Sequence, residues 1–324
     1  MTDPLLSRQP AMAEALGRTS RWRRFLSPAC VVVALAYVSW MLWGHLDDLR
    51  ASIKGIVPSG IVAFVLLATI SIAITTAYHA TLLGKLVPSQ LPRLRASSAY
   101  AVGQIVRYLP GKVWGLLYEA NVLRGRADLG SITLSVLVQT MLGYGWAMML
   151  AVTVLLGAYT RTAEPFLLLL PAAWALWLAH RKPWPWRLIA NVPLLGKRLG
   201  RRPPGLGAME SLRLSGLLVF NWLPFLAGWI FLLAGSHSSS EALAFGAAYI
   251  VASIATTVLI VVPSGLVVRE ALFTWIGTAI GFPVSDLLLY GVVVRVILTV
   301  ADLLNAGMFC AADKYRRRAA RDNE

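Results

Sequence analysis

Residues 58–84 read PSGIVAFVLLATISIAITTAYHATLLG and include no Asp, Glu, Lys or Arg. About 20 consecutive apolar residues are enough for an α-helix to cross the hydrocarbon layer of a membrane. This stretch therefore predicts a transmembrane helix.

Similar apolar runs lie on both sides of this one, at about 28–44, 97–118, 129–158, 164–180, 211–234, 241–262, 266–281 and 286–311. Of the 324 residues, 57% are apolar and only 14% are charged, and the mean hydropathy is +0.66. A soluble domain of this size needs more charged residues to cover its surface. The sequence therefore predicts an all-α, polytopic transmembrane helical bundle.

The formal charge of +15 is concentrated in short segments between the apolar runs. The tail 1–26, the loop 85–95, the Arg124/Arg126 turn, the segment 181–213 and the tail after Ala312 carry 23 of the 30 Lys and Arg residues. Lys and Arg accumulate in the cytoplasmic loops of membrane proteins and attract anionic headgroups. We therefore expect a bacterial cytoplasmic (inner) membrane, both termini in the cytoplasm, and no nucleic-acid partner.

The basic amino terminus followed by the run 28–44 has the charge pattern of a signal peptide. Trp40 and Trp43 are bulky where a cleavage site needs small residues, so we expect a retained first span. The chain then divides into a cytoplasmic tail 1–26, a membrane domain 27–312 and a cytoplasmic tail 313–324. Within the membrane domain we expect two repeats, at about 27–160 and 164–312, with a basic, Pro-rich cytoplasmic loop at 181–210.

Two stretches, 97–123 and 241–281, begin and end on the same predicted side of the membrane, so neither is a single crossing. Each is interrupted by a Pro-Gly element, at Pro110-Gly111 and at Pro263-Ser264-Gly265. Proline removes a backbone donor, and such breaks occur at membrane depth where other protein groups satisfy the backbone. We expect two re-entrant hairpins, one entering from each side.

The resulting order is span, span, broken hairpin and span, followed by the same order in inverted orientation. Inverted repeats with interrupted helices are the recurrent plan of secondary transporters. The prediction is six spans plus two re-entrant hairpins. In the alternative, 241–262 and 266–281 are two complete spans, which gives eight spans or half-spans.

Ionisable side chains at membrane depth cost about 2.5–3.5 kcal/mol on insertion scales, so they are the first candidates for function. They are Arg107, Lys112, Glu119, Arg269, Glu270, Arg295 and Asp302.

The first cluster surrounds the first break, where residues 107–114 read RYLPGKVW. Arg107 and Lys112 lie beside freed backbone N–H groups and the start of a helix, which suits an anionic headgroup. We include Tyr108 and Trp114 of the same segment in this predicted lipid-headgroup site. The alternative is that the two cations only extend to the membrane surface.

The second cluster follows the second break. Arg269 and Glu270 point about 100° apart on a helix, so they need not pair with each other. We expect Arg269 to face an anionic substrate and Glu270 to pair with Arg295, which shares a helix face with Asp302. Asp302 is then a counter-ion for Arg295 or a proton-coupling carboxylate. Glu119, Glu270, Arg295 and Asp302 form the predicted charge network, and the alternative is a buried ion pair that only fixes packing.

Catalytic and cofactor motifs are not visible: no catalytic triad, Walker loop, dinucleotide fingerprint or metal-ligand spacing occurs in the sequence. Cys30 and Cys310 lie inside apolar runs and indicate neither a disulfide nor a metal site. We therefore expect no enzyme activity, no metal and no cofactor. The enzymatic alternative, an intramembrane transferase, lacks the paired carboxylates that it would need in a cytoplasmic loop.

The segments RYLPGK at 107–112 and PSGLVVRE at 263–270, followed by the stripe from Arg295 to Asp302, resemble the lysylphosphatidylglycerol synthase transmembrane family of flippase-like membrane proteins. The resemblance covers roughly residues 25–312, with the two motifs in the expected order. The sequence departs from the family pattern at Ser264 and Val267, where glycines are common, and at Asp302, where glutamate is usual.

The resemblance implies a bundle with paired re-entrant helices that moves an anionic lipid or a lipid-linked glycan across the inner membrane. Some relatives carry an aminoacyl-transferase domain, and that reaction is not expected here because no such soluble domain is visible. Membrane lipids are therefore the expected partners. The alternative function is a non-transporting accessory protein that scaffolds envelope-biosynthesis enzymes.

Overall fold

The computed structural model describes residues 57–87, 90–106, 114–181, 206–258 and 268–321. Within these ranges every regular element is a helix, and five helices are long and apolar enough to cross a membrane. They are α4 (Pro58–Leu86), α7 (Leu129–Thr160), α10 (Ala208–Leu233), α11 (Ser239–Val258) and α13 (Val284–Arg321). The all-helical membrane class predicted from the sequence is confirmed.

Several predicted segments lie outside the described residues. They are the tail 1–26, the run 28–44, most of the loop 181–210 and the two Pro-Gly breaks. What the sequence indicates for these segments therefore stays a prediction.

The predicted span 164–180 is built from two elements instead of one long helix. A 3₁₀ turn, η1 (Glu164–Leu168), is followed by α8 (Leu169–Arg181). At 1.5 Å per residue α8 alone measures about 20 Å, which is short of the ~30 Å hydrocarbon layer. Because a 3₁₀ turn rises about 2 Å per residue, the two elements together reach about 30 Å.

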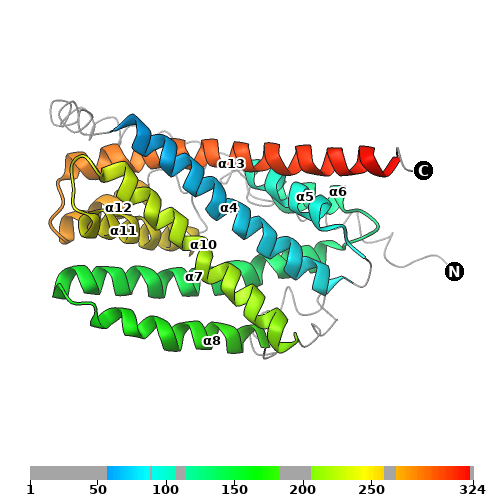
Figure 1. The fold of residues 1–324 in the computed structure, drawn as a ribbon, viewed down its shortest axis with the longest axis horizontal. Coiled ribbons are helices and arrows are strands. Elements are labelled where there is room, and N and C mark those ends of the chain that lie inside the picture. The colour runs from blue at the N-terminus through cyan, green and yellow to red at the C-terminus, as the bar shows by residue number, and fades with distance from the viewer. Residues whose placement is uncertain (1–56, 88–89, 107–113, 182–205, 259–267, 322–324) are drawn as a thin grey trace, which may run out of the picture.

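Helices α4 and α10 pack side by side through the middle of the bundle (Figure 1). Two glycines permit this close approach. Gly60 of α4 lies against the carbonyl group of Phe231, and Gly228 of α10 lies against the ring of Phe64, so a Cβ at either glycine would overlap its neighbour.

Polar side chains also join α4 to its neighbours within the apolar bundle. The hydroxyls of Ser71 and Thr75 both donate to Oδ1 of Asn221 on α10, at 3.0 and 2.8 Å. The next residue of α4, Thr76, accepts at Oγ1 a hydrogen bond from Nδ2 of Asn305 on α13 at 3.1 Å. These bonds link three of the membrane-spanning helices.

The first predicted hairpin is formed by α5 (Arg93–Val106) and α6 (Trp114–Val122), which pack against each other. Their backbones meet at Gly103 and Gly115, where a Cβ added to Gly115 would lie 2.5 Å from the carbonyl oxygen of Gly103. Over the described residues the two helices measure about 21 and 14 Å, which is less than the ~30 Å hydrocarbon layer.

The second predicted hairpin comprises α11 and α12 (Val268–Ala279), and local sequence explains where α11 begins and where α12 ends. Ser238 and Glu241 form a capping box at the start of α11: the Glu241 carboxylate accepts from the Ser238 backbone N–H at 2.8 Å, and the Glu241 N–H donates to the Ser238 hydroxyl at 3.3 Å. At the end of α12, Gly281 adopts φ 96°, and the Phe282 N–H donates to the Gly277 carbonyl, as in a Schellman motif.

The two hairpins lie at opposite ends of the bundle (Figure 1). Helix α5 packs against α13, and helix α11 packs against α7, so each hairpin is held by a long helix from the other half of the chain.

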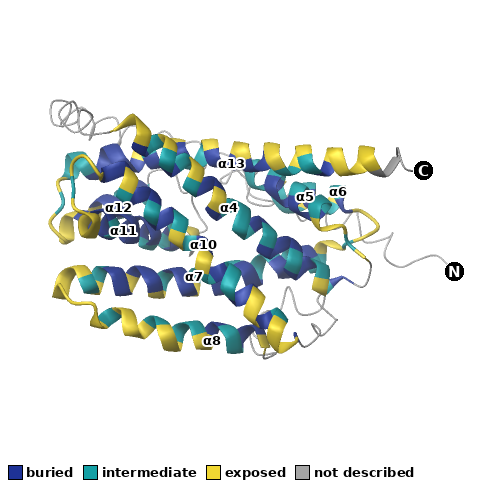
Figure 2. Cartoon of the chain, viewed as in Figure 1, coloured by how far each residue is buried: buried dark blue, intermediate teal, exposed yellow. Residues whose placement is uncertain are grey.

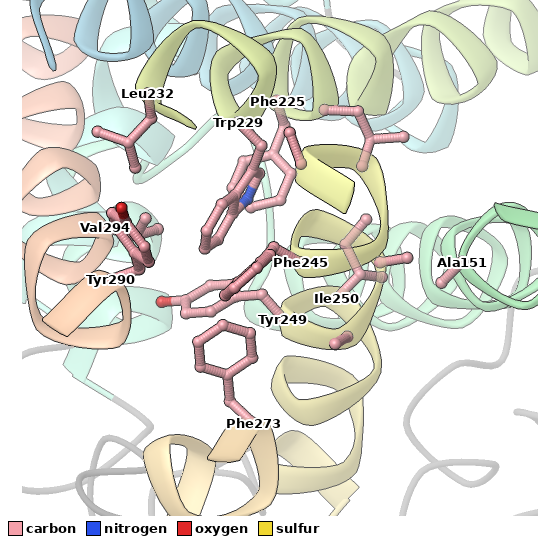
Figure 3. Close-up of a cluster of buried hydrophobic side chains, with 14 of the residues drawn as sticks. Ala151, Phe225, Trp229, Leu232, Phe245, Tyr249, Ile250, Phe273, Tyr290 and Val294 are labelled. Carbon is pink, nitrogen blue, oxygen red and sulfur yellow. The ribbon is translucent and has the colours of Figure 1, made fainter. Parts of the chain in front are cut away.

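Among the described residues, the largest buried cluster lies where α4, α7, α10, α11, α12 and α13 meet, and aromatic rings are prominent in it. Figure 3 shows Trp229, Phe245, Tyr249 and Phe273 in this cluster, and the Tyr249 and Phe273 ring centroids lie 5.4 Å apart. Large apolar side chains also cover the outside of the long helices (Figure 2), as on one face of α4 at Val62, Leu66 and Ile70. Exposed apolar faces of this kind suit contact with lipid.

Helix α13 is longer than the predicted span 286–311, because it continues without a break through Arg321. Its last turns carry exposed Lys314, Arg316, Arg317 and Arg318. Part of the predicted tail 313–324 is therefore helical, and this end of α13 extends past α5 and α6 (Figure 1).

Candidate functional site

The second predicted cluster is assembled by α12 and α13. Glu270 lies in the first turn of α12 and is 8% exposed, and Arg295 lies on α13. Nη1 of Arg295 donates to Oε1 of Glu270 at 2.8 Å. The structure thus brings together the two residues that the sequence pairs across the last hairpin and the last span.

Arg269 approaches the same carboxylate from the other side. Its Nη2 atom lies 3.5 Å from Oε1 of Glu270, so the two sequence neighbours make a contact that their 100° separation on the helix did not predict. The guanidinium carbon lies 5.1 Å from the ring centroid of Tyr249 on α11, a distance at which cation–π attraction is effective. The Nε atom of Arg269 is buried and has no hydrogen-bond partner among the described residues.

The polar stripe on α13 runs from Arg295 through Asp302 to Asn305. Asp302 and Asn305 are 3% and 1% exposed, so this face of α13 points into the bundle. Asn305 bonds to Thr76 of α4. Among the ion pairs of the described residues, Arg295 pairs with Glu270 and not with Asp302, which lies two turns away along the helix.

The first predicted cluster is only partly described. Trp114, the first residue of α6, is 49% exposed at the surface of the bundle. Arg107, Tyr108 and Lys112 lie outside the described residues, as do the break residues Pro110, Gly111, Pro263 and Gly265. The headgroup role of these residues and their surface alternative both stay predictions.

Glu119 belongs to a separate buried cluster next to the first hairpin. Its Oε1 atom lies 2.7 Å from Nε2 of His79 on α4, and both side chains are almost fully buried. The imidazole stacks on Tyr100 of α5 with ring centroids 4.1 Å apart, and its Nδ1 atom lies 3.3 Å from the Ser135 hydroxyl of α7. Gln139 of α7 donates to the Tyr100 hydroxyl at 3.0 Å.

The sequence predicts a charged role for Glu119 and an ordinary interface position for His79, and it does not predict that they pair, because the two residues come from different helices. A second buried histidine, His180 of α8, lies 2.8 Å from the Tyr78 hydroxyl and 3.1 Å from the Ser215 hydroxyl. Both histidines lie near one end of an apolar run, and the position alone does not show that one of them faces a carboxylate. The sequence signal for the His79–Glu119 contact is one acidic residue, Glu119, directly after the apolar run 97–118.

Within the described residues, no group of three or more His, Cys, Asp or Glu side chains could hold a metal ion. The second cluster combines two cations, Arg269 and Arg295, with one carboxylate, that of Glu270. No protein-family model matches the sequence, and comparison with curated proteins also gives no match.

Proposed function

We propose that this protein is a flippase-like transporter that moves an anionic lipid or a lipid-linked glycan across the bacterial cytoplasmic membrane. The observation that carries this proposal is the environment of Arg269. It is a cation at the start of a short membrane helix, stacked on Tyr249, with a buried Nε atom that no described residue satisfies. A guanidinium group binds phosphate with two parallel hydrogen bonds, so an anionic headgroup would satisfy these donors.

The depth of the charged cluster supports a transport role. Arg295 lies about 16 Å from Val284 along α13, at 1.5 Å per residue. In a hydrocarbon layer of about 30 Å this position is close to the middle. Charged side chains at such a depth usually face a substrate pathway, because exposing them to lipid is costly.

The packing pattern supports an inverted-repeat plan. In this plan α4, the α5–α6 hairpin and α7 correspond to α10, the α11–α12 hairpin and α13. Helix α4 packs on α10. The first hairpin packs on α13, the last helix of the second set, and the second hairpin packs on α7, the last helix of the first set. A two-fold axis in the membrane plane would exchange the two sets in this way.

Helix lengths favour re-entrant hairpins over two further complete spans. Helix α11 is long enough to cross the membrane, but α12 measures about 18 Å and is too short for a second crossing. Both helices of the first hairpin are too short as well.

Charge distribution supports a cytoplasmic location for the carboxyl terminus. The ends of α4 and α8 and the starts of α5 and α10 lie at that end of the bundle (Figure 1), and these segments carry Lys85, Arg93, Arg181 and Arg213. The opposite end holds Arg161 together with Glu164, Glu241 and Asp286. By the positive-inside rule, the first of these ends faces the cytoplasm.

Lipid movement in reconstituted vesicles tests this proposal. The probes are fluorescent phosphatidylglycerol, a fluorescent polyprenyl-phosphate glycolipid and a zwitterionic fluorescent phosphatidylcholine, and accessibility to a membrane-impermeant quencher reports their movement. Wild type should move an anionic probe, and Arg269→Ala should slow it at least about tenfold, which corresponds to 1.4 kcal/mol. Arg161→Ala is the control, since Arg161 is an exposed arginine in a loop between helices.

Absence of movement by well-folded wild type, with every probe, would overturn the transport function and favour the accessory role. If Arg269→Ala instead unfolds the protein, the second cluster is a structural ion pair. Gel filtration and thermal unfolding in detergent distinguish that result from a specific loss of transport.

A further inference from the structure

The His79–Glu119 couple is a buried acid–base pair that the proposed headgroup site does not use. His79 is fully buried, and the Glu119 side chain is 3% exposed. The 2.7 Å separation of His79 Nε2 and Glu119 Oε1 requires a proton between the two atoms. On the other side of the ring, the Ser135 hydroxyl can donate to Nδ1 or accept from it, so the imidazole is held in place in either protonation state.

The couple carries a different net charge in each protonation state. With a neutral imidazole and an ionised carboxylate its charge is −1, and one further proton makes the couple neutral. A net charge inside a membrane bundle is costly, so the protonation of the couple depends on the charges around it.

Few charged groups among the described residues face this couple. Helix α5 contributes the phenol of Tyr100, which stacks on the imidazole, and Arg95, whose guanidinium donates to the Val122 carbonyl one turn after Glu119 on α6. Helix α13, which packs against α4 and α5, carries the buried Asp302 one turn before Asn305. Helix α7 contributes only the uncharged Ser135 and Gln139.

Charges near the cytoplasmic end of α4 are paired with each other. Lys85, two turns after His79, forms an ion pair with Glu210 of α10. These groups are exposed, so solvent screens their effect on the buried couple.

A stripe of polar residues on α13 lies between the surroundings of the couple and the second cluster. Thr76, one turn before His79 on α4, bonds to Asn305 of α13, and the stripe on α13 continues to Arg295. Arg295 then bonds to Glu270. The polar stripe on α13 therefore runs from its contact with Thr76, one turn before His79, to the ion pair of the second cluster.

From these contacts we infer that the His79–Glu119 couple is a proton-binding site that couples lipid movement to a proton gradient. This inference rests on the proposed transport function. An anionic headgroup in the bundle makes the −1 state of the couple less favourable, so lipid binding promotes proton uptake. By linkage, proton uptake promotes binding of the anionic lipid to the same extent, and the two move in the same direction.

The distribution of fluorescent phosphatidylglycerol between leaflets tests the coupling. Vesicles of phosphatidylethanolamine and phosphatidylcholine carry the probe and a pH gradient, while valinomycin and equal K⁺ hold the membrane potential at zero. With one proton per lipid, wild type should accumulate the probe in the leaflet facing the alkaline side, up to about tenfold per pH unit of gradient.

Substitutions at the couple should remove this accumulation. His79→Gln and Glu119→Gln keep hydrogen-bonding groups but lose the titrating site, so the probe should distribute equally. Glu119→Asp keeps a carboxylate and should retain accumulation. His180→Gln is the matched control, because His180 is a buried histidine whose described partners are hydroxyl groups and a carbonyl.

Two results would overturn the coupling while leaving the transport function intact. Wild type could move the probe but distribute it equally under every gradient, or His79→Gln and Glu119→Gln could both accumulate it as wild type does. If wild type moves no probe at all, the result overturns the proposed transport function and also the proton coupling that rests on it. If the glutamine variants do not fold, the coupling is tested by the distribution of the probe between leaflets under a pH gradient, measured for wild type and for Glu119→Asp.

Discussion

Gly103 and Gly115 place the backbones of α5 and α6 in direct contact, with room for no side chain between them. A Cβ on Gly115 would lie 2.5 Å from the carbonyl oxygen of Gly103, and a Cβ on Gly103 would lie 3.1 Å from the carbonyl oxygen of Gly115. Small residues at helix interfaces allow close backbone packing in membranes. The first hairpin therefore depends on these two positions.

Gly115→Ala should destabilise the protein by about 1–3 kcal/mol, because the added methyl group forces the two helices apart. Thermal unfolding in detergent micelles measures the effect. Gly145→Ala is the control: Gly145 lies in α7 with open space where its Cβ would be, so alanine there should be neutral or stabilising. Equal melting temperatures for Gly115→Ala and wild type would contradict the observed packing.

Glu270 and Arg295 should behave as one energetic unit. Removing one partner of a buried ion pair leaves an uncompensated charge and costs about 3–5 kcal/mol. Glu270→Gln and Arg295→Gln should therefore each lower the free energy of unfolding. The double variant should lose less than the sum, by about 0.5–3 kcal/mol. Chemical unfolding of all four proteins measures this, and strictly additive losses would show that the two side chains do not interact.

Asn221 holds α4 and α10 together through two accepted hydrogen bonds. Side-chain hydrogen bonds in membranes contribute about 0.6 kcal/mol each, so Asn221→Ala should cost about 1 kcal/mol. The control on the same helix is Ser211→Ala, since the Ser211 hydroxyl is buried and has no hydrogen-bond partner among the described residues. Unfolding measurements should show a loss for Asn221→Ala only, and the reverse order would contradict the structure.

Asp128 caps the start of α7, where its carboxylate accepts from the Ser131 backbone N–H at 3.2 Å. Partial burial acts to raise the pKa of Asp128, but hydrogen bonds from the Ser131 hydroxyl and from backbone N–H groups outweigh burial and lower it. A lowered folded-state pKa gives stability that is present above the unfolded pKa and is lost as the pH falls through the folded pKa.

Asp128→Ala should therefore cost about 1 kcal/mol at neutral pH and less in acid. Asp128→Ser keeps a capping hydroxyl without a titrating group, so it should remove the pH dependence but retain most of the stability. Melting temperatures of the three proteins between neutral and acidic pH measure both effects. A constant difference between wild type and Asp128→Ser across this range would rule out the proposed role of the ionised carboxylate.

Apolar runs predicted the long helices well, because their length and composition are local properties of the chain. The run 58–84 becomes α4 (Pro58–Leu86), and the run 129–158 becomes α7 (Leu129–Thr160). The end of α13 was predicted less well: the charged residues after Ala312 mark the edge of the hydrocarbon layer, but they are compatible with a helix that continues into water.

The sequence predicted the charged residues of the site because ionisable side chains inside apolar runs stand out in the sequence. The Arg295–Glu270 contact follows from two opposite charges on neighbouring apolar segments. The His79–Glu119 contact does not, because it depends on how α4, α5, α6 and α7 pack, and helical periodicity gives no information on which helices become neighbours.

The unbroken length of α13 has a mechanical consequence. Arg295 and the exposed cations Arg316 to Arg318 lie on one straight helix, separated by about 30 Å at 1.5 Å per residue. Because a continuous helix moves as one rigid body, a small tilt of α13 beside α12 displaces its carboxyl-terminal end by several ångströms. Cys310 is exposed on the same helix and could carry a spectroscopic label. A label at Cys310, about 22 Å along α13 from Arg295, would therefore report motion that begins at the charged cluster.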